Sequence, residues 1–249
     1  IMERQTYVVT GASKGLGRAL ALALANDGHA VLALARPSSE LDEIGELLAS
    51  IVDGSRSIEC DLSDASSIAK AASLIMDQTP FLAGVVHNAG AIAPVKPLDK
   101  VDASDWGRSI QVNLVGVQDL TQRIHSLLGG EHQSRITVIS SGASLRPIGS
   151  WSAYCVAKAG LDMWSRCVAE EGRDSNISSV SVAPGIVDTG MQTEIRSTAP
   201  EDFPSLQSFI DLHANGDLAR SEEVAAQLMP LVTAHSMVQS GQRFDVREL

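Results

Sequence analysis

Three side chains that can move protons lie within one short stretch of this sequence, residues 140–159. Tyr154 and Lys158 are four residues apart at the predicted start of a helix, so both project from one face. Ser141 lies just after a β-branched run, Ile136–Ile139, that predicts a buried strand. Because a nearby ammonium favours phenolate over phenol, we expect Lys158 to lower the pKa of Tyr154 from its ordinary value of about 10. A tyrosine so tuned can exchange a proton with a substrate oxygen near neutral pH.

A glycine-rich turn near the N-terminus predicts a dinucleotide site. Residues 6–10 predict a short buried strand, residues 18–27 predict a helix, and Gly11, Gly15 and Gly17 lie between them. The glycines let the backbone approach a pyrophosphate, and the N-terminus of the helix offers unpaired N–H groups and the positive end of the helix dipole. The alternative is a glycine-rich turn without a ligand.

The end of the second predicted strand, residues 30–35, favours NADP(H) as the cofactor. An acidic residue about 20 positions after the glycines would bind the 2′-hydroxyl of an adenosine ribose. This sequence has Arg36 there, no carboxylate before Glu40, and Lys14 within the glycine turn. Two cations suit a 2′-phosphate, which arginine can bind in a bidentate manner. The alternative is a solvated arginine at a strand end.

Small and polar residues also follow the third and fourth predicted strands. Asp61 could accept a hydrogen bond from the adenine amino group, and Ser63 or Asp64 could cap the next helix. Residues 87–90, His-Asn-Ala-Gly, form a turn suited to close approach of a cofactor. The six histidines are scattered and none has metal-ligand spacing, so we expect no metal site.

Strands alternate with helices along the whole chain, which predicts an α/β Rossmann fold with a doubly wound, mostly parallel, seven-stranded sheet and helices on both faces. Further strands are predicted at residues 56–60, 82–86, 177–183 and 241–246, and further helices at 40–51, 103–128, 152–172 and from 221 onward. We expect one domain over residues 1–249, with a substrate lid at about 187–220, because a segment this long in a compact domain is often functional. The ligand should lie at the carboxyl ends of the strands.

Composition excludes several classes of partner. The formal net charge of −11 over 249 residues argues against nucleic acid and anionic membranes, which require a basic face. No uncharged apolar run approaches the roughly 20 residues of a membrane helix. The three cysteines form no C-x-x-C pair, and the first strand begins too soon after Met2 for a signal peptide. We therefore expect a cytoplasmic protein.

The motifs together resemble the compact, single-domain branch of the short-chain dehydrogenase/reductase family. The shared motifs are Thr10-Gly11-x-x-x-Gly15-x-Gly17, Asn88-Ala89-Gly90, Asn113, Ser141, Tyr154-x-x-x-Lys158 and Pro184-Gly185-x-x-x-Thr189. Residues 147–159 and 183–192 are most similar to sepiapterin reductases and related benzil-type diketone reductases. The chain departs from the family at His87, where a second asparagine is usual.

The resemblance implies a role for each matching residue. Tyr154 would be the general acid, Ser141 would bind the substrate carbonyl, and Lys158 would bind the nicotinamide ribose and tune the tyrosine. Asn113 would hold a water that relays protons to Lys158, and Thr189 would contact the carboxamide. The expected cofactor-binding residues are Gly11, Ser13, Lys14, Gly15, Leu16, Gly17, Arg36, Asp61, Leu62, Asn88, Ala89, Gly90, Tyr154, Lys158, Pro184, Gly185, Val187 and Thr189. The expected substrate-binding residues are Ser141, Trp151, Tyr154, Met191 and Asp245.

Two features bear on the substrate. Asp245 resembles the aspartate that holds the pterin ring in sepiapterin reductases, or it pairs with Arg243 or Arg247 at the surface. Apolar residues in and near the predicted lid favour an apolar or aromatic substrate, or they simply pack the lid onto the core; these are Leu145, Trp151, Met191, Phe203, Leu206 and Phe209.

We therefore expect an NADPH-dependent carbonyl reductase that transfers a hydride to a ketone or diketone, sepiapterin- or benzil-like, and that forms a homodimer through residues 103–128 and 152–172. The alternatives are oxidation of a secondary alcohol with NAD(P)+, epimerisation or dehydration of a nucleotide sugar, and a catalytically silent NADP-binding regulator. The glycine spacing and the absence of a C-terminal substrate domain count against the nucleotide-sugar reaction. The intact Ser–Tyr–Lys set counts against the regulator.

Overall fold

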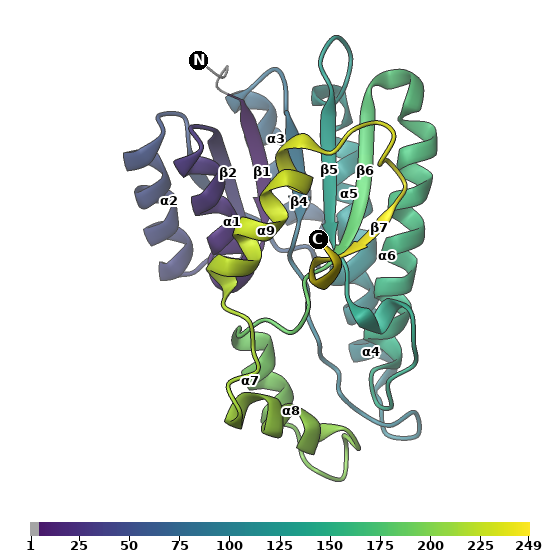
Figure 1. Cartoon of the computed structure of the whole chain (residues 1–249). Helices are drawn as coiled ribbons and strands as arrows, with labels where there is room; N and C mark the ends of the chain where they lie inside the picture. Colours follow the sequence, from purple (N-terminus) through teal and green to yellow (C-terminus); the bar gives the residue numbers. More distant parts are fainter. Residues whose placement is uncertain (1–4) are drawn as a thin grey trace.

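The computed structural model describes residues 5–249, in which one seven-stranded parallel sheet runs through the molecule (Figure 1). Its strands are β1 (Thr6–Thr10), β2 (Ala30–Ala35), β3 (Arg56–Glu59), β4 (Gly84–His87), β5 (Ser134–Ile139), β6 (Ile177–Ala183) and β7 (Arg243–Asp245). Their order is β3-β2-β1-β4-β5-β6-β7, so the direction of winding reverses between β1 and β4. The predicted doubly wound fold is confirmed, and a ligand site is expected where the winding reverses.

Helices cover both faces of the sheet (Figure 1). One face packs against α1 (Gly15–Asn26), α2 (Ser39–Ile51) and α9 (Ser221–Ala234), and the other against α3 (Ala65–Gln78), α5 (Gly116–Arg123) and α6 (Ser152–Glu171). The inner strands β2 and β6 are buried along their whole length. This burial explains why their sequences are continuous apolar or small-residue runs rather than alternating ones.

The predicted helix over residues 103–128 is not continuous. It consists of α4 (Ala103–Ile110), a π-helical turn over Gln111–Val115 and α5, followed by a short 3₁₀ helix at His125–Leu127. The side-chain amide of Asn113 donates to the Ser109 carbonyl at 2.9 Å, the group that an α-helix would pair with the backbone N–H of Asn113. A polar side chain that competes for backbone partners in this way favours such a local irregularity.

Residues 187–220 contain two helices, α7 (Gly190–Arg196) and α8 (Leu206–Ala214), which project beyond the carboxyl edge of the sheet (Figure 1). The two ends of this segment meet at its base, where Val187 forms a parallel bridge with Ala219. The Asp188 amide donates to the Ala219 carbonyl at 2.9 Å, and the Ala219 amide donates to Ile186 at the same distance. The segment is therefore a projection with a closed base, and its role as a lid stays a prediction.

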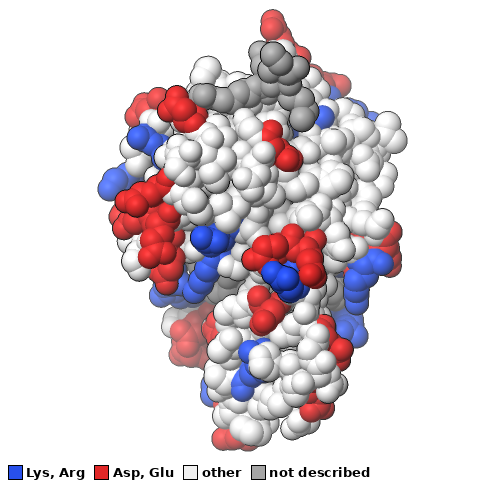
Figure 2. Space-filling view, turned by 60° about the vertical axis from the view of Figure 1, so that its left-hand side comes forward, with Lys and Arg blue, Asp and Glu red and all other residues white. Residues whose placement is uncertain are grey.

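Charge is unevenly distributed over the surface. Figure 2 shows acidic side chains along one side of the molecule, near its centre and on the α7–α8 projection, with basic side chains interspersed among them. No helix among residues 5–249 is both long enough and apolar enough to cross a membrane. Residues 1–4, which include the Met2 used in the signal-peptide prediction, lie outside the described residues.

Candidate functional site

The turn between β1 and α1 has the backbone geometry of a phosphate cradle. Gly11 and Gly15 both adopt positive φ angles, +65° and +56°, which favour glycine. A Cβ on Gly17 would lie 2.2 Å from the Gly11 carbonyl oxygen, so no larger residue fits there. Lys14 precedes α1 in extended conformation, and no side chain caps the helix. The first N–H groups of α1 are thus left for another acceptor.

The end of β4 braces this turn. The Thr10 hydroxyl accepts hydrogen bonds from the backbone N–H groups of Asn88 and Ala89, both at 3.1 Å. The Asn88 side chain donates to the carbonyls of Thr10 at 3.1 Å and Gly11 at 3.3 Å. These bonds join the two strands that flank the reversal in winding. Asn88 therefore shapes the proposed cofactor site from beneath the glycine turn.

The predicted adenosine end of the site is open to solvent. Lys14 and Arg36 are both exposed. The Ser38 hydroxyl caps α2 by accepting from the Leu41 amide at 3.2 Å. Burial pushes the pKa of Asp61 upward, but hydrogen bonds from Ser63 and the charge of Arg36 leave it below its ordinary value. Arg36 thus follows β2 and the ionised Asp61 follows β3, while Lys14 lies in the turn after β1.

The predicted catalytic residues come together near the carboxyl end of β5. Ser141 follows that strand, and Tyr154 and Lys158 lie on α6. Tyr154 is 6% exposed and Lys158 is 3% exposed. The Lys158 ammonium donates to the Ile139 carbonyl at 2.8 Å and lies 5.7 Å from the centre of the Tyr154 ring. Ser141 begins a 3₁₀ turn, Gly142–Ser144, and its hydroxyl accepts from the Ala143 amide at 3.1 Å. The structure thus brings the three side chains together, with Tyr154 and Lys158 buried and Ser141 partly exposed.

The predicted shift of the tyrosine pKa is wrong for this structure. Burial raises the pKa of Tyr154 to about 12, although hydrogen bonding with Ser141 acts in the opposite direction. Burial also lowers the pKa of Lys158 to about 8, against the charge of Asp162. Removing both groups from water disfavours both charged forms, and this effect exceeds their mutual influence. Tyr154 therefore keeps its proton across the neutral range.

Asn113 is fully buried at the π-helical turn and clamps the chain after β4. Its side-chain oxygen accepts from the Ala91 amide at 3.0 Å, and its side-chain nitrogen donates to the Ala91 carbonyl at 2.9 Å. A Cβ on Gly90 would lie 2.9 Å from the Asn113 side-chain oxygen and 3.6 Å from the Lys158 ammonium. The structure thus places Asn113 beside Lys158, as a water relay would require. Ser109, one turn before Asn113, supports this clamp and was not predicted from the sequence.

The segment after β6 closes over the glycine turn. Gly185 adopts a positive φ of +76°, and the Thr189 methyl would lie 3.1 Å from a Cβ on Gly15. Thr189 therefore lies beside the glycine turn, and its contact with the carboxamide stays a prediction. The remaining predicted cofactor contacts are buried or partly buried in the same region: Ser13, Leu16, Leu62, Ala89, Pro184 and Val187.

An aromatic cluster joins the α7–α8 projection to the catalytic helix. The Trp151 ring stacks on Phe203 with a centroid distance of 5.2 Å and an interplanar angle of 13°. It also meets the ring of Tyr154 edge-on at 5.7 Å and that of Phe209 at 5.4 Å. Met191 packs against the same cluster. The apolar residues of the projection therefore do pack it onto the core, and they do so beside Tyr154.

Two lysines reinforce this attachment. Asp202 in the projection pairs with Lys96 and, at 3.6 Å, with Lys100, both on the segment that follows β4. The carboxylate is nearly buried, whereas both ammonium groups are about half exposed. Hydrogen bonding from Lys96 holds the pKa of Asp202 below its ordinary value. The projection is thus held by stacked rings on one side and by ion pairs on the other.

Asp245 does not stand free at the end of β7. Arg247 binds both of its carboxylate oxygens, at 2.8 and 2.6 Å, and holds the pKa of Asp245 down at about 2. Its neighbour Arg243 instead points to the catalytic helix and donates to Asp162 at 3.1 Å. The surface pairing that the sequence left open for Asp245 is present with Arg247. A contact between Asp245 and substrate stays a prediction.

His87, the departure from the family pattern, is a buried structural residue. Its Nε2 pairs with the Thr121 hydroxyl at 2.8 Å, and its ring meets Trp164 edge-on at 5.8 Å. Burial lowers the pKa of His87 to about 3, so the imidazole is neutral. Within residues 5–249, no group of three or more His, Cys, Asp or Glu side chains is placed to hold a metal ion.

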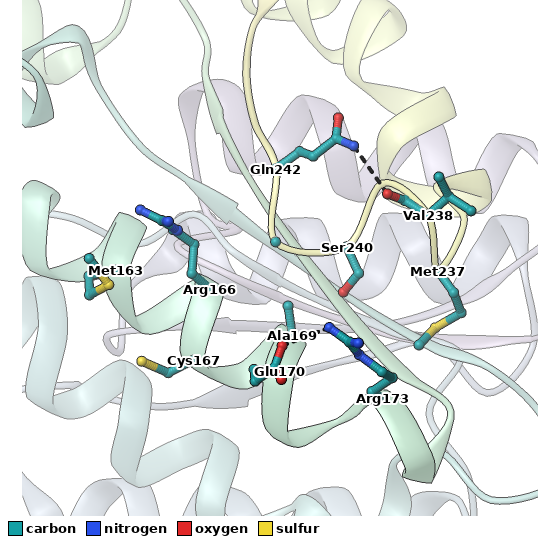
Figure 3. A pocket seen from close by; sticks show the side chains of 11 residues that line it. Met163, Arg166, Cys167, Ala169, Glu170, Arg173, Met237, Val238, Ser240 and Gln242 are labelled. Carbon is teal, nitrogen blue, oxygen red and sulfur yellow. Dashed lines mark hydrogen bonds and ion pairs between the residues drawn. The ribbon is translucent and has the colours of Figure 1, made fainter.

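A surface hollow of about 720 Å³ lies elsewhere, between the second half of α6 and residues 237–242 (Figure 3). Figure 3 shows the ion pair of Glu170 and Arg173, 2.7 Å apart, on one wall. The Gln242 side chain donates to the Val238 carbonyl at 3.1 Å on the other wall. None of the predicted catalytic or cofactor-binding residues lines this hollow.

Comparisons with known proteins agree with this geometry. A profile of the family described as short chain dehydrogenase matches residues 5–200. A benzil reductase ((S)-benzoin forming) of Bacillus cereus is 32% identical over 239 residues, which cover 93% of this chain and 95% of the relative. An NADPH-dependent pterin aldehyde reductase of Arabidopsis thaliana is 31% identical over 193 residues, covering 78% and 79%.

Among solved structures, the KRED1-Pglu enzyme is similar with a TM-score of 0.85 and 30% identity, covering 96% of this chain and 99% of that one. The family profile covers most of the sheet and every residue of the predicted catalytic set. With the sheet order and the Ser–Tyr–Lys cluster already described, these matches lead to one conclusion. The chain is an oxidoreductase of the short-chain dehydrogenase family.

Proposed function

We propose that this chain is an NADPH-dependent carbonyl reductase whose general acid is Tyr154. The observation that carries the proposal is that Ser141, which is partly exposed, lies beside the buried Tyr154 and Lys158, and that burial keeps the phenol protonated. A protonated, water-excluded phenol beside a hydroxyl donor is suited to give a proton to a carbonyl oxygen.

The residues present fit a dinucleotide phosphate. The Gly11–Gly17 turn excludes side chains, and α1 begins without a side-chain cap, so backbone N–H groups are available for a pyrophosphate. Lys14, within the glycine turn, and Arg36, about 20 positions after it, are both exposed and would bind a 2′-phosphate. When bound, NADPH supplies the hydride. The name of the Arabidopsis relative, which specifies NADPH, supports this choice.

The chain's own residues perform the remaining steps. The Ser141 hydroxyl would bind the substrate carbonyl oxygen, and Tyr154 would protonate that oxygen as the carbon is reduced. Lys158 would bind the nicotinamide ribose and stabilise the tyrosinate left behind, and Asn113 would hold the water that returns the proton. The buried surroundings keep bulk water away from the transfer.

The high pKa of Tyr154 sets the pH at which each direction can run, since the same phenol is the acid in reduction and, as phenolate, the base in oxidation of a secondary alcohol. Oxidation requires Tyr154 to act as a base, which needs the phenolate. A phenol with a pKa of about 12 supplies that base only at alkaline pH. As a proton donor, the same group is ready throughout the neutral range.

The aromatic cluster supports an aromatic ketone or diketone as substrate. Trp151 meets the Tyr154 ring edge-on, and Phe209, which is partly exposed, packs against Trp151 and could meet a substrate ring edge-on or offset. The Bacillus cereus relative is named for benzil, a diaryl diketone, and the Arabidopsis relative for a pterin aldehyde.

The test is a steady-state assay that follows NADPH oxidation with benzil, sepiapterin and a simple quinone, each repeated with NADH. We expect turnover of benzil with a preference for NADPH. Absence of turnover with all three carbonyls, combined with tight NADPH binding, would instead support the silent regulator. Preference for NADH would contradict the roles of Lys14 and Arg36.

We further propose a homodimer formed through α4, α5 and α6. Although other faces cover the sheet, apolar side chains remain exposed on α6, at Val156 and Met163, and on the π-helical turn between α4 and α5, at Val115. Light scattering at micromolar concentration should give twice the chain mass of 26.2 kDa.

All three cysteines are free, which supports a reducing compartment such as the cytoplasm.

A further inference from the structure

We propose that Arg243 is a positioning residue of the catalytic cluster, because its guanidinium joins the Ser141 backbone to the helix that carries Tyr154 and Lys158. This role rests on the proposed function, since it presumes that these three residues perform the reaction. Arg243 begins β7, the edge strand, which lies beside α6 in Figure 1.

The guanidinium reaches two elements at once. Its Nη2 donates to the Ser141 carbonyl at 3.1 Å, and its Nε donates to the Asp162 carboxylate, also at 3.1 Å. Ser141 follows β5, whereas Asp162 lies on α6, so the side chain spans β6 to connect both. A planar guanidinium has several donors in fixed directions and can make both bonds without rotating.

The first bond fixes the turn that presents the Ser141 hydroxyl. The same Ser141 carbonyl also accepts from the Ser144 amide at 3.1 Å and from the Ser144 hydroxyl at 2.8 Å. Those two bonds come from within the 3₁₀ turn and cannot fix its position relative to the sheet. The backbone N–H of Ser140 ties the start of the turn to Val182 of β6 at 2.8 Å, and Arg243 adds a side-chain bond from the edge strand to the Ser141 carbonyl itself.

The second bond controls a buried negative charge next to Lys158. Asp162 lies one helical turn after Lys158 on the same face of α6. Its side chain is 13% exposed, and its Oδ1 atom has no hydrogen-bond partner. Such a carboxylate depends on Arg243 for its pairing. Without Arg243, Asp162 would compete for the Lys158 ammonium, which now donates to Ile139.

The test measures kcat and KM for benzil, with NADPH affinity measured separately by fluorescence. If the parent does not reduce benzil, sepiapterin takes its place. Arg243→Ala should lower kcat by about ten- to hundredfold, the loss expected when a reacting group is misplaced by roughly 1 Å. The affinity for NADPH should fall less than kcat does, because Arg243 does not itself touch the proposed cofactor site and acts on it only through Asp162 and Lys158.

Two further variants separate positioning from a general loss of folding. Arg243→Lys keeps the charge and fold but cannot make both bonds, so its kcat should fall between those of the parent and Arg243→Ala. Arg243→Ala combined with Asp162→Asn removes the unpaired carboxylate, so part of the lost kcat should return. The control is Arg173→Ala, which removes an exposed arginine–carboxylate pair near the end of α6 (Figure 3).

The proposal is overturned if Arg243→Lys keeps kcat within twofold of the parent while Tyr154→Phe is inactive. It is also overturned if Arg173→Ala slows turnover as much as Arg243→Ala does, since the effect would then be one of stability. Activity in Tyr154→Phe would instead contradict the proposed function itself.

Discussion

The two ends of the proposed cofactor site differ in their contact with water. At the catalytic end, Tyr154 and Lys158 are almost completely buried, and burial raises the pKa of Tyr154 to about 12 and lowers the pKa of Lys158 to about 8. At the adenosine end, Lys14 and Arg36 are exposed. Buried groups owe their protonation state to the protein, whereas exposed cations act through screened charge. Substitutions should therefore abolish function at the first end and adjust preference at the second.

The sharpest test of the buried end is Tyr154→Phe, which removes one hydroxyl. We expect kcat to fall by about 10²- to 10⁴-fold, the usual contribution of a general acid, with NADPH affinity nearly unchanged. The chain contains one other tyrosine, Tyr7, which is also buried but lies on β1 and donates to Gln5 at 3.2 Å. Tyr7→Phe is thus a matched control that should keep its activity. Turnover of Tyr154→Phe within tenfold of the parent would remove Tyr154 from the mechanism.

The same burial should be visible in stability. A lysine with a pKa of about 8 in the fold and 10.5 when free binds fewer protons in the folded state between those values. The free energy of unfolding should therefore rise with pH from about 8 to 10.5, and the full penalty, about 3 kcal/mol by linkage, should apply below pH 8. Lys158→Met should lose activity, gain stability at pH 7 and lack this rise. Urea unfolding at pH 7 and pH 9.5 measures it, with the exposed Lys70→Met as control.

At the exposed end we expect a graded change. Arg36→Asp should reduce the ratio of kcat/KM for NADPH over NADH by about ten- to hundredfold, the equivalent of one or two charge-assisted hydrogen bonds. Added salt should weaken NADPH binding in the parent more than in the variant. Arg56→Asp makes the same change of charge at the amino end of β3, on the opposite edge of the sheet. An equal effect in both variants would mean that net charge, not a phosphate contact, sets the preference.

The smallest effect is expected at Asp245, which belongs neither to the buried catalytic end nor to the exposed adenosine end of the proposed cofactor site. Because Arg247 already occupies both carboxylate oxygens, Asp245→Ala should change kcat/KM for benzil and for sepiapterin alike, by less than about tenfold. A loss confined to sepiapterin would show that Arg247 releases Asp245 and that the carboxylate binds the pterin edge. The paired assay on both substrates distinguishes these results.

The buried strands were the most predictable part of the molecule. The strand predicted at residues 177–183 coincides with β6, because a strand covered on both faces is a continuous run without charged residues. The turn at Gly11 was equally predictable, since its positive φ angle favours glycine over other residues. At β6 and at Gly11, the local sequence preference and the tertiary environment favour the same backbone conformation.

What the sequence could not supply depends on burial and on long-range contacts. The spacing of Tyr154 and Lys158 indicated their proximity but not their removal from water, and so the expected pKa shift had the wrong sign. Arg243 was noted only as a neighbour of Asp245, because its partners Asp162 and Ser141 lie 81 and 102 positions away. The signal available in the sequence was the position of a charged residue, Arg243, at the start of the last strand.

The π-helical turn at Gln111–Val115 makes this part of the chain intolerant of changes in length. Such a turn behaves as one residue inserted into an α-helix, and each residue of an α-helix rotates the chain by about 100°. Deleting a single residue there would let α4 and α5 fuse into one regular helix, at little cost to the backbone. Asn113 would then swing away from Ala91, which it now clamps. Point substitutions around the turn can be neutral, but a one-residue deletion would make α4 and α5 one regular helix and would remove the contacts of Asn113 with Ala91.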